Sequence, residues 1–199
     1  MKKITLLICG ISLFSFAGVN SVHAQAVEQG TVIIDPYYGF PNLGKSFAED
    51  ISSSDVTVTG VGPAGMRVEY LIADRFGIGV DFIYNSFTGT YSDTSNGSVY
   101  DYEATMARTR VHLRFNYHLK ASSEDLDLYL GMGAGTNGRT WSSTTNDPAG
   151  SDENTSGTLL PFSARLAFGM RYYFTDNIGI NSEIAIGGPL MSAGLSIKF

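Results

Sequence analysis

Apolar and polar residues alternate along most of the chain after residue 24, in segments separated by stretches rich in Ser, Thr, Asn, Asp and Gly. An alternation with a period of two predicts β-strands, because successive side chains of a strand point to opposite faces. We expect eight strands, at about 30–40, 60–73, 77–88, 100–119, 125–136, 157–174, 177–187 and 190–199. We expect no helix after residue 24, because no segment there has a clear helical period.

The connections between the predicted strands alternate in length. Tight turns follow the second, fourth and sixth strands, at 74–76, 120–124 and 175–177. Longer polar connections follow the first, third and fifth strands, within 41–59, 89–99 and 137–156. The connection after the seventh strand, 187–189, is short. An even number of strands with tight turns at one end and long loops at the other is typical of antiparallel up-and-down barrels that span the outer membrane.

One face of each predicted strand is almost entirely apolar, as in Ile78, Val80 and Phe82 of the third strand. A soluble sandwich would bury this face in a core, whereas a membrane barrel would turn it toward lipid. Aromatic residues favour the barrel, because two aromatic girdles border its apolar band. We expect one girdle near the tight turns, formed by Phe115, Tyr117, Tyr172, Phe174 and Phe199, and one near the loops, formed by Tyr38, Phe40, Tyr84, Phe87, Tyr100 and Trp141.

The opposite face carries charged residues, which an eight-stranded barrel would point into a narrow lumen filled by side chains. Isolated charges there cost several kcal/mol each, so they must pair. Five acids and seven bases are near balance, which predicts a packed ion network and no wide pore. The predicted lumen charge network, including one histidine, is Asp35, Arg67, Glu69, Asp81, Arg108, Arg110, His112, Arg114, Asp127, Arg165, Arg171, Glu183 and Lys198. The inward glycines 131, 133 and 135 would either make room for arginines or serve strand curvature.

The first 24 residues have the features of a cleaved secretory signal peptide. Lys2 and Lys3 precede the apolar run Ile4–Phe16, and Val22-His23-Ala24 offers small residues for cleavage after Ala24. The only cysteine, Cys9, lies in this segment, so the mature chain has no thiol for catalysis, metal binding or disulfides. Without the two lysines, 11 basic residues face 19 acidic ones, a net charge near −8. An acidic exported chain is a poor candidate for binding nucleic acid.

The chain ends in LSIKF, with Leu195, Ile197 and Phe199 on one strand face. This ending resembles the signal by which outer-membrane proteins are recognised for insertion, which implies the barrel-assembly machinery as a partner. Together with RFGIGVDF (75–82) and TDNIGINSEIAIG (175–187), it makes residues 25–199 similar to the small outer-membrane β-barrel family of Gram-negative bacteria. That family includes the N-terminal barrel of outer membrane protein A, opacity-type barrels and porin-like barrels.

The resemblance implies an all-β fold: an eight-stranded antiparallel up-and-down transmembrane β-barrel with short periplasmic turns and longer extracellular loops. It implies the cell outer membrane as location, with outer-membrane lipid and lipopolysaccharide as surroundings. The fold is shared by adhesins, anchors, channels and enzymes, so it does not decide the function. No cofactor or metal is implied, and no further domain is expected after Phe199.

Three functions remain open. The first is a structural or adhesin-like role, in which the acidic extracellular loops contact a protein or host-surface partner and the lumen is blocked by charge. The second is a small porin for small solutes. The third is a lipid hydrolase built on His112 and Asp81, which would lie on neighbouring strands; no motif places a serine beside them. His112 and His118 lie about 20 Å apart at strand rise, too far to share a metal ion. We therefore expect no catalytic site, and histidines that pair inside the lumen.

Overall fold

The computed structural model describes residues 26–52, 55–95, 97–121 and 123–199. The proposed signal peptide, residues 1–24, lies outside these ranges. The described chain consists of strands and one helix: β1 (Val32–Phe40), α1 (Leu43–Ile51), β2 (Thr57–Ala73), β3 (Phe76–Ser95), β4 (Ser98–Leu119), β5 (Leu126–Thr136), β6 (Gly138–Thr145), β7 (Glu153–Ser156), β8 (Phe162–Tyr173), β9 (Ile178–Ile186) and β10 (Met191–Lys198).

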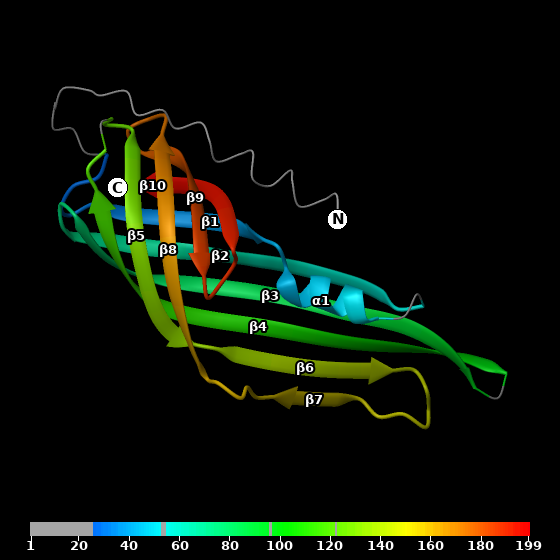
Figure 1. Ribbon diagram of the computed structural model, residues 1–199. Coiled ribbons are helices and arrows are strands. Elements are labelled where there is room, and N and C mark those ends of the chain that lie inside the picture. The colour runs from blue at the N-terminus through cyan, green and yellow to red at the C-terminus, as the bar shows by residue number, and fades with distance from the viewer. Residues whose placement is uncertain (1–25, 53–54, 96, 122) are drawn as a thin grey trace.

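All strand pairs are antiparallel, and the sheet closes on itself (Figure 1). β1 pairs with both β2 and β10, while β3 pairs with β4. β4 pairs with β5 along one part of its length and with β6 along the other, so β5 and β6 together form one spanning strand. β7 pairs with β6, and β8 pairs with β5 and β9. The chain is therefore a closed barrel of eight spanning strands, as the sequence pattern predicts.

The two faces of the barrel differ as the alternation predicts. Large apolar side chains remain exposed around the outside, where no part of the described chain covers them. They include Val68, Ile72, Ile78, Val80, Phe82, Val111, Leu113, Leu130, Met132, Leu166, Phe168, Ile178, Ile180, Ile184 and Leu195. Such a surface would be unfavourable in water and suits the hydrocarbon of a bilayer. No helix among the described residues is long and apolar enough to cross a membrane.

At the loop end, one side of the barrel is much taller than the other (Figure 1). The first residues of β2, Thr57–Val61, pair only with β3, because β1 begins to pair with β2 at Ala64. β3 and β4 continue together to the pair Ser95–Ser98, and β6 and β7 extend the same sheet beside β4. We call the part formed by Thr57–Val61, 87–109, β6 and β7 the projecting sheet.

The projecting sheet and α1 correct the expectations for the long connections. Residues 89–99 are mostly strand, because polar Ser and Thr still pair in register across the β3–β4 hairpin. The segment 137–156 contains β6 and β7, and 41–59 contains a helix. Nine residues are too few to reveal a helical period clearly. α1 is capped by Asn42, whose side chain accepts a hydrogen bond from the Lys45 backbone N–H, and Lys45 pairs with Glu49 at 3.4 Å.

The girdle near the loops is also only partly as expected. Tyr38 and Phe40 are exposed on the outer face. Phe87 points the other way and lines a cavity at the barrel mouth, while Trp141 pairs across strands with Met106, which lines the same cavity. Tyr100 lies near the tip of the β3–β4 hairpin, opposite Asp93. Near the tight turns, Phe115, Tyr172, Phe174 and Phe199 are exposed as predicted.

Candidate functional site

The lumen contains a buried ion network, and the part of it nearer the loop end is centred on Glu183 of β9. The Glu183 carboxylate lies 2.6 Å from Arg67 Nη1, 2.8 Å from Arg114 Nη2 and 2.6 Å from Arg165 Nη2. Tyr129 also donates its hydroxyl to Glu183 at 3.0 Å. Three guanidiniums from β2, β4 and β8 therefore meet at one carboxylate.

The part of the network nearer the tight turns is centred on Arg171 of β8. Its guanidinium lies 2.9 Å from Asp35, 2.6 Å from Glu69 and 2.7 Å from Asp127. His118 lies between the last two acids, with Nε2 2.9 Å from Glu69 and Nδ1 2.7 Å from Asp127. Because both ring nitrogens face carboxylate oxygens, both can donate only as the imidazolium.

Asp81 extends the group around Glu183, and Asp35 connects the two centres. Asp81 accepts from Tyr37 at 2.6 Å and lies 3.2 Å from Arg114. Asp35 accepts from Ser196 at 2.6 Å and lies 3.8 Å from Arg67. All eight spanning strands thus contribute a polar side chain to one connected group.

The lumen ion network consists of five carboxylates, four guanidiniums and one imidazole: Asp35, Arg67, Glu69, Asp81, Arg114, His118, Asp127, Arg165, Arg171 and Glu183. Their side chains are at most 3% exposed. At this depth, uncompensated charges are very unfavourable. The pairing of five negative with five positive groups is what makes the arrangement physically reasonable.

Four of the predicted lumen residues lie outside this network. Lys198 donates to the backbone oxygen of Ala26 at 2.6 Å and lies 4.3 Å above the Tyr173 ring, at the tight-turn end. His112 bonds to a serine, as described below. Arg108 and Arg110 lie at the loop-end mouth, and no carboxylate pairs with them in the described part of the chain.

Glycine makes room for the network on β5. A Cβ on Gly131 would lie 2.5 Å from Arg114 Nη2 and 2.6 Å from Asn116 Oδ1. Gly135 is required for a different reason. A Cβ there would collide with the backbone of Val111 and His112. Room for an arginine therefore explains Gly131, and close approach of two strands explains Gly135.

Two uncharged members of the site were not among the predicted network residues. Tyr37 donates to Asp81 and lies under the Arg67 guanidinium at 4.2 Å, while Asn181 accepts from Arg67 at 2.7 Å. Both residues alternate in phase with a predicted inward charge, Tyr37 with Asp35 and Asn181 with Glu183. Strand parity therefore places both side chains in the lumen, but a neutral side chain carries no charge that requires a partner.

The imagined hydrolase triad is only partly assembled. His112 Nε2 contacts Ser163 Oγ, and Asp81 pairs across strands with His112. However, Ser163 donates its hydroxyl to the Thr136 carbonyl at 2.8 Å, and His112 Nδ1 has no hydrogen-bond partner in the described structure. Asp81 instead serves Tyr37 and Arg114. A triad requires the acid to orient the histidine, and Asp81 does not do so here.

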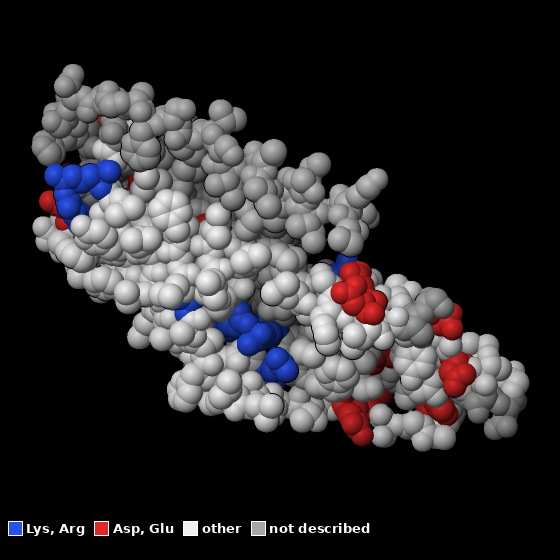
Figure 2. All heavy atoms as spheres, in the orientation of Figure 1, with Lys and Arg blue, Asp and Glu red and all other residues white. Residues whose placement is uncertain are grey.

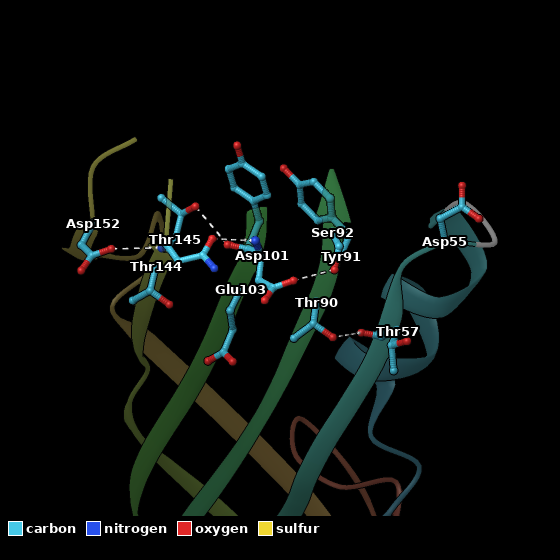
Figure 3. A pocket seen from close by; sticks show the side chains of 12 residues that line it. Asp55, Thr57, Thr90, Tyr91, Ser92, Asp101, Glu103, Thr144, Thr145 and Asp152 are labelled. Atoms are coloured by element: carbon cyan, nitrogen blue, oxygen red, sulfur yellow. Dashed lines mark hydrogen bonds between the residues drawn. The ribbon is translucent and has the colours of Figure 1, made fainter. Parts of the chain in front are cut away.

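Acidic residues gather at the far end of the projecting sheet (Figure 2). A groove of about 640 Å³ lies there (Figure 3), and its lining includes Asp55, Asp101, Glu103 and Asp152. Ser92 donates to Asp101 at 2.6 Å, which keeps that carboxylate beside the hairpin.

Aromatic stacking stiffens the opposite face of the same hairpin. The Tyr91 and Tyr102 rings stack with centroids 4.9 Å apart. Tyr102 also donates its hydroxyl to Asp147 at 3.0 Å, which raises the pKa of that phenol. The tip is thus an ordered, acidic surface.

The family model of the outer membrane protein beta-barrel domain matches residues 12–188. The chain belongs to this family. Its location is accordingly the outer membrane. No curated protein matches the chain significantly.

Solved structures similar to this chain include three outer-membrane barrels. The N-terminal barrel domain of OprF from Pseudomonas aeruginosa is 15% identical with a TM-score of 0.44, covering 87% of this chain and 100% of that one. OprG from the same organism is 13% identical with a TM-score of 0.46, covering 90% and 99%. Ail, the attachment invasion locus protein of Yersinia pestis, is 13% identical with a TM-score of 0.38, covering 86% and 99%.

Proposed function

We propose that this protein is a non-enzymatic outer-membrane scaffold with a blocked lumen, which presents its projecting sheet to partners at the cell surface. The observation that carries the proposal is the lumen ion network, in which polar side chains from all eight spanning strands meet in one buried group. A lumen occupied in this way favours anchoring over transport. The ordered projecting sheet supplies a rigid contact surface above it.

The partner we propose is a protein with a basic surface. Exposed carboxylates at the tip, among them Asp93, Asp101, Glu103, Asp152 and Glu153, give complementary charge. Loops and hairpins on a rigid scaffold are common carriers of binding. Lipopolysaccharide would surround the base of the sheet, with divalent cations bridging its phosphates to acids.

The second candidate is a small porin. It is favoured by the inward glycines of β5, because a residue without a side chain leaves space in the lumen beside the barrel wall. Against it, a Cβ on Gly131 would meet Arg114, so that the space is already occupied by a side chain. A third candidate, the hydrolase, is disfavoured by the occupied Ser163 hydroxyl and the displaced acid.

Export and insertion complete the proposal. Residues 1–24 would direct export and be removed after Ala24. Leu195, Ile197 and Phe199 would form the insertion signal read by the barrel-assembly machinery. Leu195 and Phe199 are 52% and 69% exposed on the outer face, the face that would meet lipid after insertion.

A shortened hairpin tests the surface role. Deleting 92–95 together with 98–101 keeps Asn96 and Gly97 and places these two residues between Tyr91 and Tyr102, which already pair across the strands. We expect the barrel to fold normally, whereas cells expressing the variant should lose binding to an epithelial cell layer. Binding is counted against cells expressing the full-length protein.

A charge variant serves as the matched control for this deletion. Asp101→Asn with Glu103→Gln keeps the hairpin length and removes two tip acids. If charge carries recognition, this variant should lose much of the binding that the deletion loses. Full binding by cells carrying the shortened hairpin would contradict a contact role for the tip.

A further inference from the structure

Three arginines with no carboxylate partner lie together at the loop-end mouth of the barrel. Arg108 of β4 and Arg139 of β6 are directly paired across the strands, and Arg110 follows on the same face as Arg108. No carboxylate lies within 4 Å of these guanidiniums in the described structure. Like charges directly opposite each other on a sheet are destabilising. We call Arg108, Arg110 and Arg139 the arginine cluster.

Neutral hydrogen bonds hold two of these arginines in place. Asn137 Oδ1 accepts from Arg108 Nε at 2.7 Å and from Arg110 Nε at 3.4 Å. Asn137 is itself 6% exposed and donates to the Leu160 carbonyl at 2.8 Å. Arg110 Nη1 also donates to the Gly187 carbonyl at 3.4 Å, whereas the two Nη groups of Arg108 have no partner in the described structure. Arg108 and Arg110 are therefore positioned but not neutralised.

The arginine cluster lines one side of a cavity of about 360 Å³. This volume lies within the usual range for small-molecule sites. Figure 2 shows basic atoms in the middle of the molecule, apart from the acidic far end. A further guanidinium lies close behind the cavity lining: the buried Arg165 Nη1 has no hydrogen-bond partner in the described structure, and a Cβ on Gly188, a lining residue, would collide with it.

The other side of the cavity is apolar. α1 presents Leu43 and Phe47, one turn apart, and they are 62% and 66% exposed. Phe87 and Met106 of the neighbouring strands and Pro189 complete this side. A ligand with an anionic group and an apolar part could pair with the guanidiniums and cover these exposed apolar side chains at the same time.

We propose that this cavity binds a small amphiphilic anion, with its carboxylate or phosphate on the arginine cluster and its apolar part against Leu43, Phe47 and Phe87. Such a site would be distinct from the lumen ion network, whose charges are matched. It would also be independent of the acidic tip, so it goes beyond the surface role proposed above. Its ligand could come from solution, as a free alkyl carboxylate, or from the membrane, as an anionic lipid.

The single tryptophan of the chain can report on this site, because Trp141 pairs across strands with the lining residue Met106. The protein is inserted into phosphatidylcholine vesicles and titrated with decanoate, decanol and inorganic phosphate while Trp141 fluorescence is recorded. We expect a saturable change in fluorescence with decanoate. Decanol and phosphate should each bind at least about tenfold more weakly than decanoate.

Matched variants show whether the arginine cluster is responsible. Arg108→Gln with Arg139→Gln should weaken decanoate binding roughly tenfold or more, whereas Arg75→Gln at the opposite end should leave it unchanged. Phe47→Ala should weaken decanoate but not phosphate. Folding of each variant is checked by gel mobility without heating. The arginine variant should fold at least as well as the parent, because it removes like-charge repulsion.

Two sources of ligand are separated by lipid composition. If vesicles containing phosphatidylglycerol give the same fluorescence change and compete with decanoate, the site takes a membrane lipid; if they do not compete, it takes a free amphiphile. Both results support the site. An unchanged signal with decanoate, equal binding by the arginine variant, or equally tight binding of decanol or phosphate would overturn the proposal.

Discussion

The Glu183→Ala variant should lose about 3–5 kcal/mol of folding free energy, which is the usual cost of leaving buried charges without their partner. Glu183 is 1% exposed, and it neutralises Arg67, Arg114 and Arg165 through contacts of 2.6 to 2.8 Å. Without it, the carboxylates of the described chain that remain near these three cations are Asp81 and Asp35, at 3.2 to 3.8 Å. Urea unfolding in lipid vesicles, followed by circular dichroism, measures the loss.

An exposed carboxylate provides the control for this variant. Glu103→Gln lies on the projecting sheet and should change the unfolding free energy by less than about 0.5 kcal/mol. Glu183→Gln keeps the shape of the side chain and should remain close to the alanine variant, since the negative charge is the missing element. A loss below about 1 kcal/mol in Glu183→Ala would mean that the buried ion pairs do not hold the barrel together.

Replacing Arg171 by methionine should cause a loss of similar size, again about 3–5 kcal/mol. Arg171 is fully buried and joins Asp35, Glu69 and Asp127, which belong to three different strands. Without Arg171, Glu69 and Asp127 keep His118 as their positive partner, and Asp35 keeps Arg67 Nε at 3.8 Å. The unfolding free energy in vesicles is the measurement, and Arg75→Met at a tight turn is the control.

The Arg171→Lys variant distinguishes charge from geometry. Lysine keeps the positive charge but has a single ammonium group, whereas the planar guanidinium reaches three carboxylates at once. We therefore expect only partial recovery of stability compared with Arg171→Met. Complete recovery would show that net charge alone matters at this position, and no recovery would show that the fork of nitrogens is essential.

The closed barrel and its inward charges follow from one local property, the alternation of side chains along a strand. Parity alone places Asp35, Glu69, Arg171 and Glu183 on the same side of the sheet. Which acid meets which arginine could not be predicted, because that depends on the register of strands far apart in sequence. Asp35 and Arg171, which are 136 residues apart, show this clearly.

The loop end was harder to predict because Ser, Thr and Asn occur both in loops and in solvated strands. The hairpin of β3 and β4 continues into a polar stretch that composition alone marks as a loop. The near balance of inward charges also led to a wrong expectation there, because it counted Arg108 and Arg110 as members of the lumen network. Arg108 and Arg110 have the parity of lumen residues, but they lie at the mouth, where Asn137 interrupts the neighbouring strand and accepts hydrogen bonds from both.

Single-channel recording on the purified protein in a planar bilayer tests the central claim, that the lumen ion network blocks the barrel. We predict no steady conductance steps above the bare membrane for the wild-type protein across a range of voltages. Steady steps that change in size with Arg110→Ala or Glu183→Ala would show ions passing through the lumen, and would contradict the account.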